Sequence, residues 1–360
     1  MNPASNTYTG FTRVELEFVV PTNRFRFHAR SMDLGPASLN GGNLTLTVST
    51  NPAGWVTAQA DSLIPTGVHT FECSFTNNFN RDGAGLYKTI SGGKNYLVTQ
   101  FEPMDARQAF PCWDEPGFKI PWRITVTAPE GLVVVGNMPI ANTVSRDGTT
   151  THEFGRTPPM PSYLVALAVG PFETVDIPGQ SVPGRLVTPS GQARLAEMAR
   201  GYAPPLLAAL ERYFGIPHPY PKLDHLAVPA FASGAMENVG AITYREGLLL
   251  LDEKHAAIEQ RRLLVLIVTH EMAHQWFGNL VTMRWWEDLW LNEAFASWAA
   301  FKIGRQLYPD LRFDLMEYES GASARAVDSQ PSVKAILPAK RQNQTPISNL
   351  GGVPELLSCP

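Results

Sequence analysis

Short runs of apolar and β-branched residues, separated by turn residues, fill the first half of the chain. Examples are residues 14–20, 44–48, 122–126 and 132–135, which lie between stretches rich in glycine, proline, asparagine and aspartate. Runs of this length and composition predict β-strands, and no long stretch before about residue 175 repeats its apolar residues with a helical period. The pattern therefore predicts an antiparallel β domain over residues 1–175.

The pattern changes after a stretch rich in proline and glycine. Residues 177–184 read Ile-Pro-Gly-Gln-Ser-Val-Pro-Gly, which is typical of a connection, and we take 176–184 as a linker. Beyond it, residues 192–214 and 259–307 have the composition and apolar spacing of helices. The sequence thus predicts the α+β class, with the β domain followed by a second, partly helical domain over residues 185–360.

One of the predicted helices carries polar residues among apolar ones. The stretch 261–279 predicts a helix, and Gly278 near its end is typical of a residue that follows a helix. Its faces are filled by apolar side chains, namely Leu263, Leu264, Ile267, Val268 and Met272. The same stretch contains His270, Glu271 and His274, with valine, threonine, methionine and tryptophan around them. Such neighbours indicate a buried helix rather than a solvated face.

The spacing of these polar residues suits a metal. His270 and His274 are four residues apart, so a helix points both imidazoles in one direction, where zinc binds nitrogen at about 2.0–2.1 Å. Glu271 lies beside that face, near enough to take a proton from a water that zinc has made acidic. Glu293 opens a second predicted helix, 291–307, and is the expected third ligand. We therefore predict one zinc ion per chain, bound by His270, His274 and Glu293, with Glu271 as general base.

Composition and charge argue against several other classes of protein. The 360 residues carry a formal net charge of −4, which indicates no surface for nucleic acid. The polar start of the chain and a longest aliphatic run of only 263–268 predict neither a signal peptide nor a membrane span. The cysteines, Cys73, Cys112 and Cys359, are too few and too scattered for a disulfide framework. We therefore expect a reducing, cytoplasmic location.

Further motifs resemble a known family. Gly234-Ala235-Met236-Glu237-Asn238 precedes the His-Glu-x-x-His motif, and Trp-Leu-Asn-Glu, ending at Glu293, follows it. This combination is similar to the aminopeptidase N family of gluzincin zinc aminopeptidases. Residues 99–107, 110–116, 213–217 and 285–290 are also similar to segments of that family. The resemblance spans about residues 10 to 330.

The resemblance implies a zinc metalloaminopeptidase with a thermolysin-like catalytic domain, which removes the N-terminal residue from peptides. It implies that Glu237 and Glu102, with Gln100 nearby, bind the free amino terminus of the substrate. This assignment is physically reasonable, because an ammonium group that enters a closed site needs carboxylates as partners. Two glutamates held near zinc would also fix the amino terminus at a distance of one residue from the scissile carbonyl.

The other residues of the Gly-Ala-Met-Glu-Asn motif complete the predicted substrate-binding set. These residues are Gly234, Ala235, Met236 and Asn238. Gly234 and Ala235 are small and lie next to an extended run, 239–244, so a substrate backbone would be able to lie against that strand.

The chain departs from the family at both ends. The family's first strand, which precedes a segment like 11–21, is missing, and the family's C-terminal domains have no counterpart, so we expect a truncated catalytic domain. The family also places a tyrosine well downstream of the third ligand, where its hydroxyl stabilises the oxyanion. No tyrosine follows Tyr318, which comes too soon after Glu293 and is better explained as a helix-surface aromatic. Loss of one oxyanion donor typically costs about 2.7–4 kcal/mol, so activity is expected to be weak.

Alternative functions therefore stay open. The main one is a zinc- and peptide-binding fragment with negligible turnover. Another is the related leukotriene hydrolase branch, which the unaltered Gly-Ala-Met-Glu-Asn motif disfavours. The amine-binding glutamates disfavour an endopeptidase. The preferred N-terminal residue, the physiological substrate and the oligomeric state do not follow from the sequence.

Overall fold

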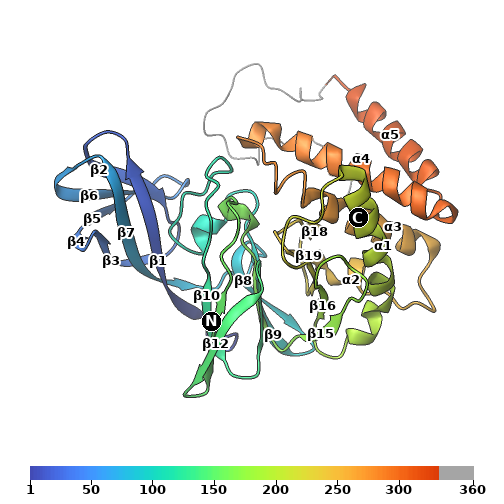
Figure 1. The fold of residues 1–360 in the computed structure, drawn as a ribbon, viewed down its shortest axis with the longest axis horizontal. Coiled ribbons are helices and arrows are strands. Elements are labelled where there is room, and N and C mark those ends of the chain that lie inside the picture. Colours follow the sequence, from blue (N-terminus) through green and yellow to red (C-terminus); the bar gives the residue numbers. More distant parts are fainter. Residues whose placement is uncertain (332–360) are drawn as a thin grey trace. The chain divides into compact units, whose positions relative to one another are not determined.

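The computed structural model describes residues 1–331 and divides the chain into two compact units (Figure 1). The first unit contains residues 1–136 and 140–170, and the second contains residues 137–139 and the chain from Pro171 onward. The first unit consists of antiparallel sheets and the second adds helices, which confirms the predicted α+β class. The part of the predicted catalytic domain beyond residue 331 lies outside the described residues.

Four antiparallel sheets make up the first unit. The first has the order β1 (Thr7–Phe18), β7 (Gly67–Asn78), β3 (Asp33–Leu39) and β4 (Gly42–Asn43). The second has the order β2 (Thr22–His28), β6 (Trp55–Ile64) and β5 (Thr45–Val48). The third has the order β11 (Val133–Gly136), β14 (Leu167–Gly170), β9 (Lys94–Gln100) and β8 (Gly85–Ser91). The fourth has the order β10 (Thr125–Pro129), β13 (Thr149–Phe154) and β12 (Ile140–Arg146). The described helical segments of this unit are two 3₁₀ turns, Ala106–Gln108 and Ser162–Leu164. This agrees with the sequence pattern, which predicts strands and no long helix in this half of the chain.

Strand β1 shows why this part of the sequence folds as a sheet. Its residues alternate between exposed and half-buried along all 12 positions, as expected where one face of a sheet packs inward. In the neighbouring β7 and in β2, Phe71 and Phe27 are fully buried, and their rings lie 5.1 Å apart. Trp113 packs against both rings. Apolar residues of β2 and β7, with Trp113 packed against them, therefore form part of the core of this unit.

A buried ion pair holds the loops that follow β9. Arg107 Nε and Asp114 Oδ2 are 2.9 Å apart, and the two side chains are only 4% and 1% exposed. Arg107 also donates to the carbonyl oxygen of Ala53 (2.7 Å), while the Ser162 hydroxyl donates to Asp114 Oδ1 (2.6 Å). Because both charges are compensated by these hydrogen bonds, the pair fixes residues that are distant in the sequence.

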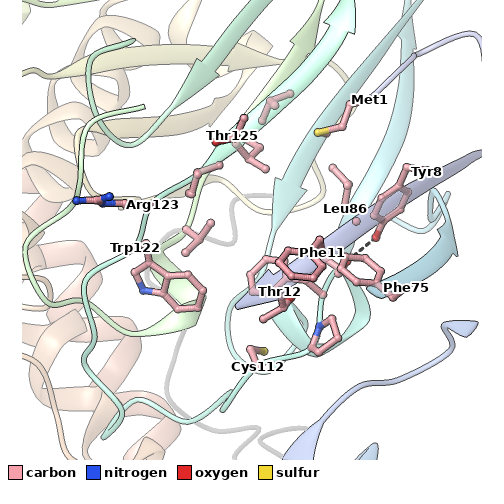
Figure 2. Close-up of a pocket in the computed structure, with 18 of the residues that line it drawn as sticks. Met1, Tyr8, Phe11, Thr12, Phe75, Leu86, Cys112, Trp122, Arg123 and Thr125 are labelled. Atoms are coloured by element: carbon pink, nitrogen blue, oxygen red, sulfur yellow. Dashed lines mark hydrogen bonds between the residues drawn. The ribbon is translucent and has the colours of Figure 1, made fainter. Parts of the chain in front are cut away.

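The first unit also contains a groove of about 1400 Å³ (Figure 2). Tyr8, Phe11 and Phe75 lie on one side of it, and Trp122 and Thr125 on the other. Strands β1 and β10 contribute many of its lining residues, and each is an edge strand of its sheet. None of the lining residues belongs to the site predicted from the sequence.

The second unit contains a five-stranded mixed sheet. Its order is β15 (Glu173–Asp176), β16 (Arg185–Thr188), β17 (Asp224–Val228), β19 (Ala241–Arg245) and β18 (Ala235–Met236). Strands β16, β17 and β19 are parallel, and the two edge strands are antiparallel to their neighbours. Residues 177–184, which resemble a linker in the sequence, connect β15 to β16 within this unit, where the Ile177 N–H donates to the Gly184 carbonyl (2.9 Å). The functional domain limits stay a prediction.

Helices pack on this sheet (Figure 1). They are α1 (Glu197–Phe214), α2 (Glu246–Leu249), α3 (Ile258–His274), α4 (Leu289–Leu307) and α5 (Phe313–Asp328), with 3₁₀ turns at Ala193–Ala196, Trp286–Asp288 and Pro309–Leu311. Helix α3 packs against α1 and α4, and its Leu264, Val265, Ile267 and Val268 are at most 1% exposed. No helix within residues 1–331 is long and apolar enough to cross a membrane.

Helix α3 ends earlier than the sequence predicts. It stops at His274 rather than near Asn279, and Gly278 is not the residue that caps it. The chain turns after His274, because the Asn279 N–H returns to the His274 carbonyl (3.0 Å) and Gly278 adopts φ 135°. A Cβ on Gly278 would lie 3.0 Å from His274 Nδ1, so glycine is required by close approach to that imidazole.

The buried pair predicts a large loss of stability on substitution. Arg107→Leu leaves the Asp114 carboxylate buried without its charge partner, and we expect the free energy of unfolding to fall by about 3–5 kcal/mol. Denaturant unfolding followed by circular dichroism measures this change. The control is Arg146→Leu, which breaks an ion pair that is 85% and 86% exposed and should leave the midpoint unchanged. Equal effects of the two substitutions would contradict a structural role for the buried pair.

Candidate metal centre and active site

Helix α3 carries three polar side chains into the interior of the second unit. His270, Glu271 and His274 are 4%, 4% and 1% exposed. Burial of groups that can ionise is costly unless each has a partner. The arrangement therefore indicates a site with a function rather than a helix surface.

The structure brings the three predicted ligands together. His270 Nε2 and His274 Nε2 are 3.0 Å apart, and the carboxylate oxygens of Glu293 on α4 lie 3.3 and 3.7 Å from them. Tetrahedral zinc with ligands at about 2.0–2.1 Å keeps its ligand atoms roughly 3.3 Å apart. Two imidazole nitrogens and one carboxylate at these separations fit zinc in both donor type and spacing.

Each histidine is oriented by a second contact. His274 Nδ1 lies 3.1 Å from the Phe277 carbonyl oxygen, which only accepts, so Nδ1 carries the proton and Nε2 is left to bind a metal. His270 Nδ1 lies 3.3 Å from the hydroxyl of Ser297. Sequence reasoning missed both contacts. Ser297 follows Glu293 by four residues on α4 and thus shares its face, which is a signal that was available in the sequence.

The charges of the site favour metal binding. Burial lowers the pKa of His270, although the hydrogen bond to Glu293 opposes this, so the imidazole is neutral near pH 7 as a ligand must be. Burial alone would raise the pKa of Glu293, but its electrostatic interactions with His274 and His270 and its hydrogen bond to His270 outweigh this and lower the pKa to about 2. Glu293 is therefore an anion over the whole physiological range.

Glu271 and Glu237 approach the same imidazole from other directions. Oxygens of both carboxylates and a ring nitrogen of His274 all lie within 4.8 Å of one another. Burial raises the pKa of the Tyr244 hydroxyl on β19, and the charge of Glu271 adds to this rise. The Tyr244 hydroxyl is 2.9 Å from His225 Nδ1. The general base predicted from the sequence thus lies beside the candidate metal ligands.

Glu237 differs from Glu293 in its surroundings. Its side chain is 3% exposed, and within residues 1–331 its Oε1 has no hydrogen-bond partner. Burial raises the pKa of Glu237, the charge of His274 opposes the rise and the charge of Glu293 adds to it. A buried carboxylate without a hydrogen-bond donor is costly in the free protein and favours the binding of a cation.

The segment that carries Glu237 lies at the edge of the sheet. Ala235 and Met236 form β18 and pair with Tyr244 and Thr243 of β19, so the segment runs beside the extended run expected from the sequence. Its preceding residue, Gly234, accepts from the Arg245 N–H (2.9 Å). The side chain of Asn238 donates to the Thr243 hydroxyl (3.3 Å). The motif residues are therefore held as a strand and tight loop next to the metal ligands.

Several residues that hold this segment were not foreseen. Gln275 and Asn279, which follow the metal helix, both donate to the Glu237 carbonyl oxygen, at 3.0 and 2.7 Å. Lys222 donates to the Gly240 carbonyl (2.6 Å) and pairs with Asp224 (3.0 Å). No local pattern in the sequence identifies the bonds to the Glu237 and Gly240 carbonyls, because they join residues that are 18 to 42 positions apart.

Gln100 and Glu102 belong to the first unit. Gln100 ends β9, where it pairs with Gly85 of β8, and is 8% exposed. Glu102 lies two residues later and is half-buried. Their predicted role beside Glu237 stays a prediction, as do the roles of the other site residues.

Tyr318 lies on α5 and is 70% exposed. It has the environment of a helix-surface aromatic, which is the interpretation that the sequence favours.

Comparison with known proteins agrees with the geometry of the site. Residues 1–164 match the family model for the peptidase M1 N-terminal domain, and residues 199–350 match that for the peptidase family M1 domain. The chain is 36% identical over 298 residues to aminopeptidase N of Acetobacter pasteurianus, which covers 81% of this chain and 84% of that relative.

Other relatives are longer. The chain is 37% identical over 316 residues to aminopeptidase M1-A of Oryza sativa subsp. japonica, which covers 84% of this chain and 36% of the relative. It is 40% identical over 245 residues to mitochondrial aminopeptidase 2 of Saccharomyces cerevisiae, which covers 66% of this chain and 26% of the relative. The chain therefore spans about a third of the length of these curated relatives.

The site predicts different effects of two substitutions on metal content. His274→Ala removes a ligand and should abolish stoichiometric zinc, whereas Glu271→Gln removes only a neighbouring carboxylate and should retain about one zinc per chain. Inductively coupled plasma mass spectrometry on the dialysed proteins measures this ratio. Equal loss of zinc in both variants would contradict the division into ligand and base.

Proposed function

Because the chain belongs to peptidase family M1, we propose that it is a zinc-dependent aminopeptidase that hydrolyses the first peptide bond of peptides with a free amino terminus. One observation carries the proposal above all others. Glu237 Oε1 is buried and has no hydrogen-bond partner within residues 1–331, and its carboxylate lies within a few ångströms of His274 and Glu293. This arrangement supports a site where an ammonium group would bind next to the metal.

His270, His274 and Glu293 would hold the metal. Bound there, zinc would act as a Lewis acid that lowers the pKa of a water toward neutrality and polarises the scissile carbonyl. The donor set of two imidazoles and one carboxylate is the one found in hydrolytic zinc sites of the thermolysin type.

Glu271 is the proton carrier in this proposal. Its carboxylate is buried beside His274, away from bulk solvent. It would take a proton from the attacking water and then give it to the nitrogen of the departing peptide. A carboxylate that performs both transfers needs only to lie within hydrogen-bond reach of each atom in turn.

Glu237 would bind the amino terminus. An ammonium group supplies both the hydrogen bond and the positive charge that the buried carboxylate lacks, so its binding offsets the cost of burying Glu237. We further propose that Glu102 and Gln100 contribute to the same recognition, as the family resemblance implies. A fixed amine site limits cleavage to the first peptide bond and disfavours an endopeptidase.

The edge strand β18 would align the substrate backbone. β18 is the last strand of its sheet, so its outer main-chain groups are directed away from β19. An extended peptide that lies along Gly234, Ala235 and Met236 would pair with these groups, and the small side chains of the first two leave room for it. Asn238 supports this strand through its bond to Thr243.

The cysteines of the described residues fit the reducing, cytoplasmic location expected from the sequence. Cys73 and Cys112 are both buried and free, and burial raises the pKa of the Cys73 thiol to about 11. Such thiols are poorly reactive. The location itself stays a prediction.

Release of a fluorophore from alanyl, leucyl and arginyl amides tests the proposal. The purified 360-residue chain should show turnover with zinc and lose it with a chelator. The matched Glu271→Gln variant should retain zinc and lose at least roughly a hundredfold in kcat, the usual size of a general-base contribution. Stoichiometric zinc without turnover in the unmodified chain would overturn the proposal and favour the alternative, a zinc- and peptide-binding protein.

Glu237→Ala should weaken only the binding of substrates with a free amino group. We expect KM for leucyl amides to rise by roughly tenfold or more, since a charge-assisted partner worth about 1.5–3 kcal/mol is lost, with no effect on weak cleavage of an N-acetylated substrate. Steady-state kinetics on both substrates measures the difference. Glu253→Ala, at an exposed glutamate of the same unit, is the control and should change neither value. An unchanged KM in Glu237→Ala would remove this residue from the amine site.

A further inference from the structure

Gln275 has no part in the proposed chemistry, yet it is fully buried and directly follows the ligand His274. Both ends of its side-chain amide bind one short segment. Its Oε1 accepts from the Gly240 N–H (3.1 Å), and its Nε2 donates to the Glu237 carbonyl oxygen (3.0 Å). One side chain therefore joins the metal helix to the first and last residues of the segment 237–240.

The rest of the segment is also held by buried groups. Asn137 Nδ2 donates to the Val239 carbonyl (2.9 Å), and Lys222 Nζ donates to the Gly240 carbonyl (2.6 Å). Gly240 has φ 64°, and a Cβ there would lie 2.6 Å from the Asn137 carbonyl oxygen. The backbone of this segment thus has little freedom to shift, and Gln275 binds both of its ends.

We propose that Gln275 is a positioning residue that fixes the separation between the Glu237 carboxylate and the metal ligands, and so determines that a single residue precedes the cleaved bond. This inference rests on the proposed function. His274 is the last residue of α3 and Gln275 follows it directly, so the Gln275 amide links the position of His274 to the backbone of Glu237. A displacement of about 1 Å in such a site can change a rate or affinity by roughly a hundredfold.

The chemistry of glutamine suits this role. An amide both donates and accepts, so it satisfies an N–H and a carbonyl oxygen at once, without adding a charge next to the metal ligands. Methionine has a similar length but forms neither bond. Glutamate keeps an acceptor for the Gly240 N–H but repels the carbonyl oxygen of Glu237. Gln275→Met therefore removes both hydrogen bonds, and Gln275→Glu removes only the one to the Glu237 carbonyl oxygen.

The experiment compares ligand binding in zinc-loaded proteins that carry Glu271→Gln, so that hydrolysis does not consume the ligand. Isothermal titration calorimetry measures the affinity for leucine amide and for N-acetyl-leucine amide. Adding Gln275→Met should leave about one zinc per chain but weaken leucine amide binding by roughly 10- to 100-fold, with no change for the acetylated compound. In the active background, KM for leucyl amides should rise far more than kcat falls.

The control is Gln260→Met, which makes the same change at an exposed position of α3 where Gln260 caps the helix start through the Ala257 N–H. It should leave the preference for leucine amide unchanged. Gln275→Glu gives a second test if Gln275→Met does not fold, and it should lower the same preference. A full preference for leucine amide in Gln275→Met, or in Gln275→Glu where only that variant folds, would overturn the inference. Absence of any preference in the protein with native Gln275 would instead overturn the proposed function.

Discussion

The functional half of this protein depends on the burial of three ionisable side chains on one helix. His270, Glu271 and His274 are almost inaccessible to solvent, although each would be hydrated in the unfolded chain. The protein compensates this cost with Glu293 from α4, with the Phe277 carbonyl and with the hydroxyl of Ser297. The contact between α3 and α4 thus contributes both to the core and to the candidate site, since it brings Glu293 to His270 and His274.

The same helix also controls the substrate side of the site. Gln275 and Asn279, which follow it, donate to the carbonyl oxygen of Glu237, while the Oε1 of Glu237 has no donor among residues 1–331. The hydrogen bonds to the backbone of Glu237 hold the residue in place and leave one oxygen of its carboxylate available to a ligand. Under the proposed function, the amino terminus of a substrate would offset the energy that burial of Glu237 costs in the free protein.

Much of the fold and of the candidate site follows from local sequence patterns. The change from short β runs to helical periods predicts the two kinds of architecture, and the spacing of His270 and His274 places both imidazoles on one face. The predicted helix end near Asn279 was wrong, because α3 ends at His274. Gly278 does not cap the helix, and a side chain there would be too close to the His274 imidazole. Gln275, Asn279 and Lys222 were missed, because their roles depend on partners brought close only by the folded sheet.

The most direct test of this account is zinc K-edge X-ray absorption spectroscopy on the protein loaded with one zinc per chain. The account predicts a first shell of two imidazole nitrogens and oxygen ligands at about 2.0–2.2 Å, without sulfur. It also predicts that Glu293→Gln alters the oxygen contribution but leaves both imidazoles in place. A shell with fewer than two imidazoles, or a sulfur ligand at about 2.3 Å, would contradict the assignment of His270, His274 and Glu293.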